Sequence, residues 1–137
     1  MAPRGMISQR IRLLDSDVMI DIQRQHPAAV AWYVSVPSGT LALPRHTLME
    51  LYQDAQNTQQ TLVIDRLTAP LPIVWPSDIE CLQAVKSFRL LHLSHNLGLV
   101  DALIAAAALS LGAPLCTFNV KHFRAVPGLV TEQPYLR

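Results

Sequence analysis

Four carboxylates in this chain lie within or beside apolar runs, where a core side chain would normally stand. Asp15 and Asp17 follow a short apolar run, Glu50 stands between Met and Leu, and Asp101 interrupts a long run of Leu, Val, Ile and Ala. A carboxylate is costly to bury unless a partner compensates its charge. Carboxylates from three separated segments therefore indicate a shared cation, and the sequence predicts a metal-dependent hydrolase.

The types of donor atom limit which metal can bind. Carboxylate oxygens without neighbouring cysteines or paired histidines favour hard cations such as Mg²⁺ or Mn²⁺. Such a cation lowers the pKa of a bound water and stabilises the charge that develops when water displaces a phosphodiester. The chain has no His-Glu-x-x-His zinc motif, no glycine-rich phosphate loop and no Gly-x-Ser-x-Gly nucleophile motif. Hydrolysis with Mg²⁺ or Mn²⁺ is the predicted chemistry.

Three of these acids also have a local interpretation. In the first turn of a helix, Asp101 would interact with the helix dipole, but this leaves its apolar neighbours unexplained, so metal binding is favoured. Glu50 completes a Thr47-x-x-Glu50 capping box and would accept a hydrogen bond from the Thr47 amide, which leaves a local and a functional role both open. For Asp17, near a helix N-terminus, the dipole interaction is favoured over metal binding.

The elements that must position these acids follow from the apolar periodicity. Strands are predicted at residues 11–14, 40–43, 71–75 and 115–117, with an edge strand at 129–130. One helix is predicted to follow an N-cap at Ser16, and further helices at residues 28–36, 47–57, 60–67, 78–90 and 98–111. Strands that alternate with helices predict an α/β sandwich with a mostly parallel sheet.

Several polar side chains follow predicted strands directly. Asp15 comes after the first strand, and Thr117 and Asn119 come at and after the end of the strand at 115–117. Ligands of parallel α/β sheets bind beyond the carboxyl ends of the strands. We therefore expect these side chains and Asp101, at the start of its helix, to face one crevice.

Length and composition indicate one domain, spanning residues 1–137 with a loose leader at residues 1–9. Half of the residues are apolar and 15% are charged, which excludes a disordered chain, and the net charge of +1 gives no pointer to a partner. Cys81 and Cys116 are isolated and are expected to be reduced thiols. A glycine and a proline interrupt the uncharged stretch 102–120, so a buried helix and strand are favoured over a membrane span. No secretory signal is visible, and we expect a cytoplasmic protein.

Four segments of the chain match the motifs of a known enzyme family. Leu13-Leu-Asp-Ser-Asp-Val-Met-Ile20 resembles its opening strand motif, and Leu48-Met-Glu-Leu51 resembles its central acidic motif. Leu97-Gly-Leu-Val-Asp-Ala-Leu-Ile-Ala-Ala106 is the most specific segment, and Thr117-Phe-Asn-Val-Lys-His-Phe123 resembles the closing motif. Together they resemble the PIN-domain ribonucleases, specifically the VapC-like toxins of bacterial toxin–antitoxin pairs, over nearly the whole chain.

The resemblance implies a three-layer α/β sandwich with helices on both sides of a central, mostly parallel sheet. It implies endonucleolytic RNA cleavage by a metal-activated water, leaving a 5′-phosphate and a 3′-hydroxyl, with Asp15, Glu50 and Asp101 as catalytic acids that bind Mg²⁺ or Mn²⁺. Three residues would brace these acids or touch phosphate: Ser16, Thr117 and Asn119. Three basic residues would contact the RNA backbone: Arg45, Lys121 and Arg124. Family members are usually homodimers that a cognate antitoxin protein neutralises.

The chain departs from the family pattern at His122, where many relatives carry Asp or Glu. The change removes a negative charge and would weaken a second metal site. Three roles remain open for His122 itself: a contact to phosphate, proton transfer, or no part in the reaction. A degenerate PIN module that binds RNA or a protein partner without cleavage is therefore an alternative, which turnover would exclude. Asp15-x-Asp17 also resembles a phosphatase of the haloacid-dehalogenase type, but the chain is short for that fold and shows no later lysine or paired-aspartate motif.

Overall fold

The computed structural model describes residues 10–137, so the leader predicted at residues 1–9 lies outside the described residues. The described strands are β2 (Arg12–Leu14), β3 (Leu41–Pro44), β4 (Ile73–Val74), β5 (Leu115–Cys116) and β6 (Thr131–Glu132). The described helices are α1 (Ser16–Gln23), α2 (Pro27–Ser35), α3 (Arg45–Asp54), α4 (Thr58–Thr68), α5 (Asp78–His95), α6 (Leu99–Leu111) and α7 (Val120–Phe123).

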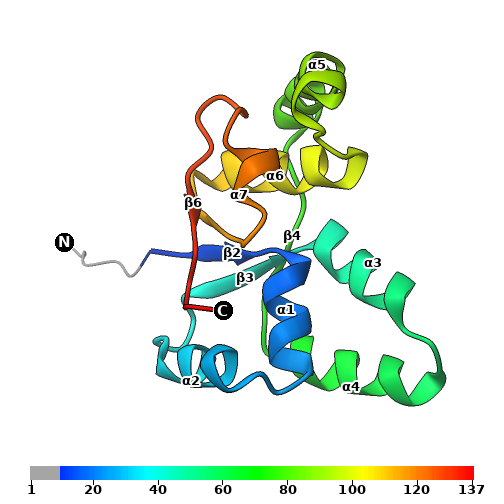
Figure 1. Cartoon of the computed structure of the whole chain (residues 1–137), viewed down its shortest axis with the longest axis vertical. Coiled ribbons are helices and arrows are strands. Elements are labelled where there is room, and N and C mark those ends of the chain that lie inside the picture. The colour runs from blue at the N-terminus through cyan, green and yellow to red at the C-terminus, as the bar shows by residue number, and fades with distance from the viewer. Residues whose placement is uncertain (1–9) are drawn as a thin grey trace.

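The described strands form one five-stranded sheet in the order β4-β3-β2-β5-β6, and every neighbouring pair is parallel. Helices α1, α2 and α4 lie on one side of this sheet, and α5, α6 and α7 lie on the other (Figure 1). The predicted α/β architecture, with a parallel sheet between two helical layers, is confirmed. Because the strands are parallel, all of their carboxyl ends meet at one edge of the sheet.

Two apolar cores, one on each face of the sheet, follow from the alternation of side chains along each strand. Leu13 of β2 points into the core beneath α6, whereas its neighbour Leu14 points into the core shared with α1 to α4. Both leucines are fully buried. The central strand is therefore covered on both faces, which explains why it reads as a continuous apolar run rather than as an alternating one.

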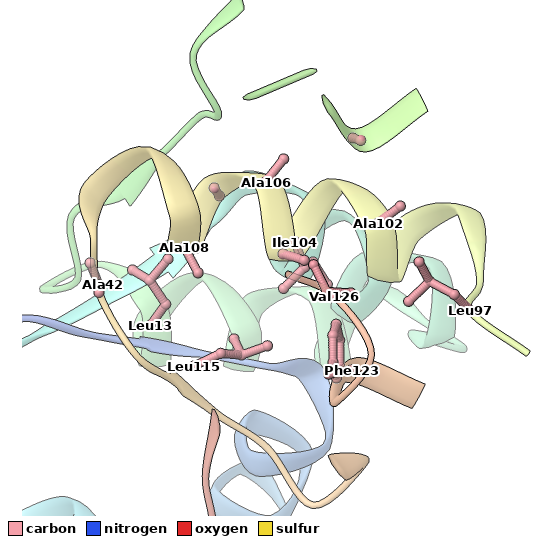
Figure 2. Close-up of a cluster of buried hydrophobic side chains, with 14 residues drawn as sticks. Leu13, Ala42, Leu97, Ala102, Ile104, Ala106, Ala108, Leu115, Phe123 and Val126 are labelled. Atoms are coloured by element: carbon pink, nitrogen blue, oxygen red, sulfur yellow. The ribbon is translucent and has the colours of Figure 1, made fainter. Parts of the chain in front are cut away.

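Helix α6 is apolar around most of its circumference because it is enclosed by the sheet, by α5 and by the segment that contains α7. Figure 2 shows its small side chains, Ala102, Ala106 and Ala108, in the core that also contains Phe123 and Val126. The helix ends at Gly112, which adopts φ 61° in the left-handed region that glycine enters without strain. Within residues 10–137, no helix is long and apolar enough to cross a membrane.

The starts of α1 and α3 differ from the sequence predictions in ways that bear on the acids. The N-cap of α1 is Asp15 rather than Ser16, because the Asp15 carboxylate accepts a hydrogen bond from the Ser16 amide. Helix α3 begins at Arg45, directly after β3, so Thr47 lies inside the helix and the predicted Thr47–Glu50 capping box is wrong. The Thr47 hydroxyl instead donates to the Leu14 carbonyl, at 3.0 Å in the core.

Other boundaries shift as well, including the start of α4 at Thr58 instead of residue 60. Helix α5 begins after the predicted cap Ser77 but runs to His95 instead of residue 90, and it ends where Asn96 adopts a left-handed conformation. The edge strand β6 lies at Thr131–Glu132, two residues beyond the predicted 129–130. A local sequence pattern does not predict the position of β6, because its pairing with β5 joins residues that are distant in the chain, such as Leu115 and Thr131.

Candidate active site

Asp15 stands at the carboxyl end of the central strand, where both of its carboxylate oxygens have hydrogen-bond partners. Its Oδ1 accepts from the Ser16 amide at 2.8 Å, and its Oδ2 accepts from the Thr117 hydroxyl at 2.7 Å. Its own amide donates to the Cys116 carbonyl at 3.0 Å and so extends the pairing of β2 with β5. Asp15 is 4% exposed, and its orientation is therefore set by α1 and by the residue that follows β5.

Asp17 connects the first turn of α1 to the loop after β5. Its Oδ1 accepts from the Val18 amide and its Oδ2 from the Phe118 amide, both at 2.8 Å. The Val18 amide is the partner that the local interpretation near a helix N-terminus predicts, whereas the Phe118 amide is a tertiary partner that it does not. Burial nevertheless raises the pKa of Asp17, and the two amide hydrogen bonds offset only part of this effect.

Thr117 is fully buried beneath the site, and its hydroxyl connects Asp15 to the loop after β5. While it donates to Asp15, its hydroxyl oxygen accepts from the Asn119 amide at 2.9 Å. The Asn119 side-chain nitrogen lies 2.8 Å from Nδ1 of His122, which in turn lies 3.9 Å from Oδ2 of Asp101. The residue that replaces an acid in the closing motif thus faces the third predicted acid.

Asp101 and Glu50 line the same cleft from two other helices, α6 and α3. Asp101, in the first turn of α6, accepts from the Gly98 amide at 3.3 Å, and a Cβ on Gly98 would lie only 3.1 Å from the same carboxylate oxygen. Glu50 projects from the second turn of α3, and its Oε1 is buried without a hydrogen-bond partner among the described residues. Burial raises the pKa of Glu50, and the neighbouring acids add to this, whereas the Ser16 hydroxyl lowers it.

These side chains line one open cleft of about 370 Å³ at the carboxyl edge of the sheet. The residues around it are Asp15, Ser16, Asp17, Glu50, Asp101, Phe118, Asn119 and Arg137. The structure therefore brings the three predicted acids together, with Ser16 and Asn119 beside them and Thr117 underneath. The predicted RNA contacts Arg45, Lys121 and Arg124 are not among the residues that line it.

Sequence reasoning missed two residues that line the cleft, Phe118 and Arg137, and one that acts through Asp101, Gly98. Arg137 lines it although more than one hundred residues separate it from α1 in the chain, and no local pattern marks it. The sequence predicts Gly98 only as the start of a helix, yet its missing side chain leaves room for Asp101. A glycine three residues before an acid at the start of a helix is a sequence pattern that could have indicated this close approach.

A larger hollow, of about 510 Å³, lies at the opposite edge of the sheet. It is lined by residues that precede the strands, including Ile11 and Pro114, and Glu132 is its one acid among the described residues. Without a cluster of reactive groups, it offers no comparable chemistry. The acidic cleft is therefore the candidate active site.

The charges in the cleft favour a cation. Burial raises the pKa of Asp15 from 3.8 to about 7, and the neighbouring Asp17 adds to this rise. Burial raises the pKa of Asp17 and Glu50 as well. A cation would stabilise all of these carboxylates in the charged form.

The spacing and type of the donor groups limit which metal ion the cleft can hold. Within residues 10–137, no three side chains of His, Cys, Asp or Glu come together as a compact metal-binding group. Mg²⁺ usually keeps several waters and takes only one or two carboxylates from the protein, so wider spacing of the acids is compatible with it. The buried Oε1 of Glu50 has no partner among the described residues, as expected for a ligand or a water acceptor. The residues therefore fit a hydrated hard cation.

Comparison with known proteins gives a consistent result. The sequence model of the PIN domain family matches residues 12–129. Ribonuclease VapC1 of Haemophilus influenzae (strain R2866) is 32% identical over 126 residues, covering 87% of this chain and 94% of the relative. Ribonuclease VapC10 of Mycobacterium tuberculosis (strain H37Rv) is 35% identical over 113 residues, covering 81% and 84%.

Solved structures show the same fold. VapBC-1 from nontypeable Haemophilus influenzae superposes with a TM-score of 0.74 at 29% identity, covering 89% of this chain and 96% of that one. DNA-bound VapBC from Salmonella typhimurium has a TM-score of 0.77 at 20% identity, covering 90% and 97%, a likeness of fold alone. The family match includes strands β2 to β5 and the acids of the cleft, and it ends before β6. The chain thus belongs to the PIN domain family and is similar, along most of its length, to the VapC ribonucleases.

Proposed function

We propose that this protein is a metal-dependent endoribonuclease and the toxin of a toxin–antitoxin pair. The observation that carries the proposal is the convergence of Asp15, Glu50 and Asp101 on one cleft of a PIN domain. The relatives named ribonuclease, which match this chain over more than four fifths of its length, support RNA as the substrate. Membership of the PIN family also argues against the phosphatase alternative.

Asp15, Glu50 and Asp101 would hold Mg²⁺ or Mn²⁺. When bound, the cation would supply an acidified water and charge stabilisation for hydrolysis of the phosphodiester to a 5′-phosphate and a 3′-hydroxyl. The chain itself fixes the acids: Thr117 holds Oδ2 of Asp15, and the Gly98 amide holds Asp101.

Other roles of the cleft residues would be to orient the attacking water and to contact the phosphate. Glu50 would orient the attacking water, because its Oε1 is buried and has no partner among the described residues. Ser16 and Asn119, which line the cleft, would brace the acids or contact phosphate. Arg45, Lys121 and Arg124 lie outside the cleft lining, so any contacts that they make would be to more distant parts of the RNA.

The proposal includes two protein partners. Solved neighbours are VapBC complexes, which supports a cognate antitoxin for this chain. A second copy of the chain is expected as well, and the long helix α5 supports it because it exposes apolar side chains. Leu82 is 66% exposed and Leu93 is 90% exposed, a surface that a partner would cover. An RNA substrate would place the protein in the cytoplasm.

The function is tested by incubating antitoxin-free protein with total RNA in Mg²⁺ or Mn²⁺, alongside an EDTA control and the variant Asp101→Asn. We expect discrete cleavage products that disappear in both controls, since each removes the cation or one of its ligands. Mapping the ends of the products would identify the substrate.

Intact RNA with folded, metal-bound wild-type protein would contradict the nuclease. That result would favour the degenerate PIN module, for which the position of His122 beside Asp101 provides a structural reason. Restoration of cleavage by His122→Asp would then show that the missing acid is the cause.

A further inference from the structure

The segment that follows β6 runs back across the molecule to α1 and brings Arg137 to the rim of the acidic cleft (Figure 1). Its attachment point is Asp21 on α1, which is 8% exposed. Arg137 donates from Nε to Oδ2 of Asp21 at 3.0 Å and from Nη2 to Oδ1 at 3.1 Å. The Tyr135 hydroxyl donates to the same carboxylate at 2.8 Å. Asp21 therefore holds Arg137 in a defined orientation through two parallel hydrogen bonds.

A second contact fixes the guanidinium from the side of the cleft. Its central carbon lies 4.7 Å from the centre of the Phe118 ring, which also lines the cleft. The Phe118 amide donates to Asp17, so the ring that supports Arg137 belongs to the loop that orders the acids. Nη1 of Arg137 has no partner within residues 10–137, and the side chain keeps 46% of its exposure.

The cleft is strongly acidic, and the guanidinium of Arg137 is positioned to attract phosphate to it. Four carboxylates line the cleft, and Arg137 is the one basic side chain among the described residues around it. RNA is a polyanion, and the acids would repel each phosphate that the cation does not neutralise. A planar, permanently charged guanidinium is suited to bind a phosphate oxygen.

We propose that Arg137, held by Asp21 and Phe118, forms a phosphate-binding subsite for the RNA strand at the rim of the cleft. Nη1 donates to a non-bridging oxygen of a phosphate, while Nε and Nη2 stay on Asp21. The subsite rests on the proposed function, because it takes RNA as the ligand. Arg137 acts in substrate binding, and the acids carry out the chemistry.

The alternative is a purely structural role, in which Arg137 only attaches the segment after β6 to α1. Both roles require the ion pair with Asp21, so stability measurements alone do not separate them. A phosphate contact also changes the affinity for RNA and its dependence on salt, because each neutralised phosphate releases counterions. A fastening contact changes neither.

The test compares Arg137→Gln with Arg66→Gln, which removes the same charge from an exposed position on α4. Steady-state cleavage of RNA is measured at saturating Mg²⁺. For Arg137→Gln we expect KM to rise roughly tenfold with kcat little changed, as for loss of a charged contact made equally in ground and transition states. Arg66→Gln should match the wild type in both parameters.

Binding is measured by fluorescence anisotropy with a labelled, mixed-sequence, single-stranded RNA, on the inactive Asp101→Asn protein so that no cleavage intervenes. Loss of one phosphate contact should reduce the slope of log affinity against log salt by about 0.7. Asp21→Asn should weaken RNA binding by a smaller factor, because the charge remains but its orientation is released. Arg137→Lys should recover part of the affinity, since it restores the charge without the planar fork.

Unchanged KM and salt slope in Arg137→Gln, together with a lowered melting temperature, would overturn the subsite and leave only the fastening role. If Arg137→Gln does not fold, wild-type RNA affinity in both Asp21→Asn and Arg137→Lys would overturn it equally. Failure of the wild type to cleave RNA contradicts the proposed function instead, and the anisotropy series still decides whether Arg137 binds phosphate.

Discussion

Asp15 is hydrogen-bonded by a buried hydroxyl, that of Thr117, which links it to the loop after β5. Thr117 donates to its Oδ2 at 2.7 Å and at the same time accepts from the Asn119 amide, so one side chain orders an acid and the loop beside it. The hydroxyl also lowers the pKa of Asp15 against the larger, raising effect of burial. A residue that does not line the cleft thus contributes to both the orientation and the pKa of this acid.

Thr117→Val keeps the shape of this side chain and removes the hydroxyl. We expect the free energy of unfolding to fall by about 1–3 kcal/mol, because a buried carboxylate and an amide lose their partner. RNA cleavage should fall with it, and more Mg²⁺ should be needed for half-maximal activity, because Asp15 is less well oriented and binds its proton more tightly. Urea denaturation and a Mg²⁺ titration of cleavage would measure the two effects.

Thr117→Ser is the matched control, since it retains the hydroxyl and loses only a methyl group. Wild-type Mg²⁺ dependence in Thr117→Val would contradict the role of Thr117 in orienting Asp15.

At the scale of elements, the two ends of α6 are both glycines but for different reasons. Gly112 has φ 61°, and nothing lies within 4 Å of a Cβ added there, so only its backbone conformation calls for glycine. Gly98 has φ −80°, which any residue adopts, but an added Cβ would lie 3.1 Å from Oδ2 of Asp101. One glycine ends the helix and the other leaves space for an acid of the cleft.

Alanine at each position should separate these roles. Gly98→Ala should lower RNA cleavage at least several-fold by displacing Asp101, while the free energy of unfolding changes by less than about 1 kcal/mol because alanine suits this backbone. Gly112→Ala should cost about 1 kcal/mol of stability through backbone strain and leave cleavage per folded molecule unchanged. Thermal melting and initial rates of the two proteins provide the comparison. Equal activity of both variants would show that Asp101 tolerates the added methyl group.

Boundaries of elements also show where local sequence rules fail. The Thr47-x-x-Glu50 pattern predicted a capping box, but α3 starts two residues earlier, because β3 leads into it directly at Arg45. The Thr47 hydroxyl is then buried and bonds to the Leu14 carbonyl, 33 residues away in the chain. A capping rule considers only neighbours in sequence, and here a partner on another element satisfied the hydroxyl. The change leaves Glu50 without its local partner and directed to the cleft.

For the molecule as a whole, the acids link stability to pH and to metal. Because burial and Asp17 raise the pKa of Asp15 to about 7, the folded protein keeps a proton that the unfolded chain loses near its ordinary pKa of 3.8. The free energy of unfolding of the metal-free protein should therefore fall as pH rises from about 4 to about 7. The raised pKa values of Asp17 and Glu50 act in the same direction.

We expect the melting temperature in EDTA to be higher at pH 5 than at pH 8, and Mg²⁺ to raise it more at pH 8, where the cation does not compete with protons. Differential scanning fluorimetry at both pH values, with and without Mg²⁺, would measure this. In Asp15→Asn the pH dependence should become weaker, because the carboxyl group whose pKa is raised to about 7 is absent. An equal effect of Mg²⁺ at pH 5 and pH 8 would contradict the linkage.

The sequence by itself determined the class of the fold and the identity of the acids. Apolar strands and amphipathic helices alternate along the chain, and this periodicity specifies a parallel sheet between helices because each element must bury its apolar face. Asp15, Glu50 and Asp101 were recognisable because charged groups rarely stand in such runs. These are local properties, which a linear pattern can contain.

Only the tertiary structure decided which groups share the cleft. Arg137 reaches it because β6 pairs with β5 and the following segment returns to Asp21, two events that depend on contacts distant in sequence. Likewise, Thr117 became a partner of Asp15 because β2 and β5 are neighbours in the sheet. Hydrogen bonds and ion pairs act over a few ångströms in space, so the chain must fold before their partners are defined.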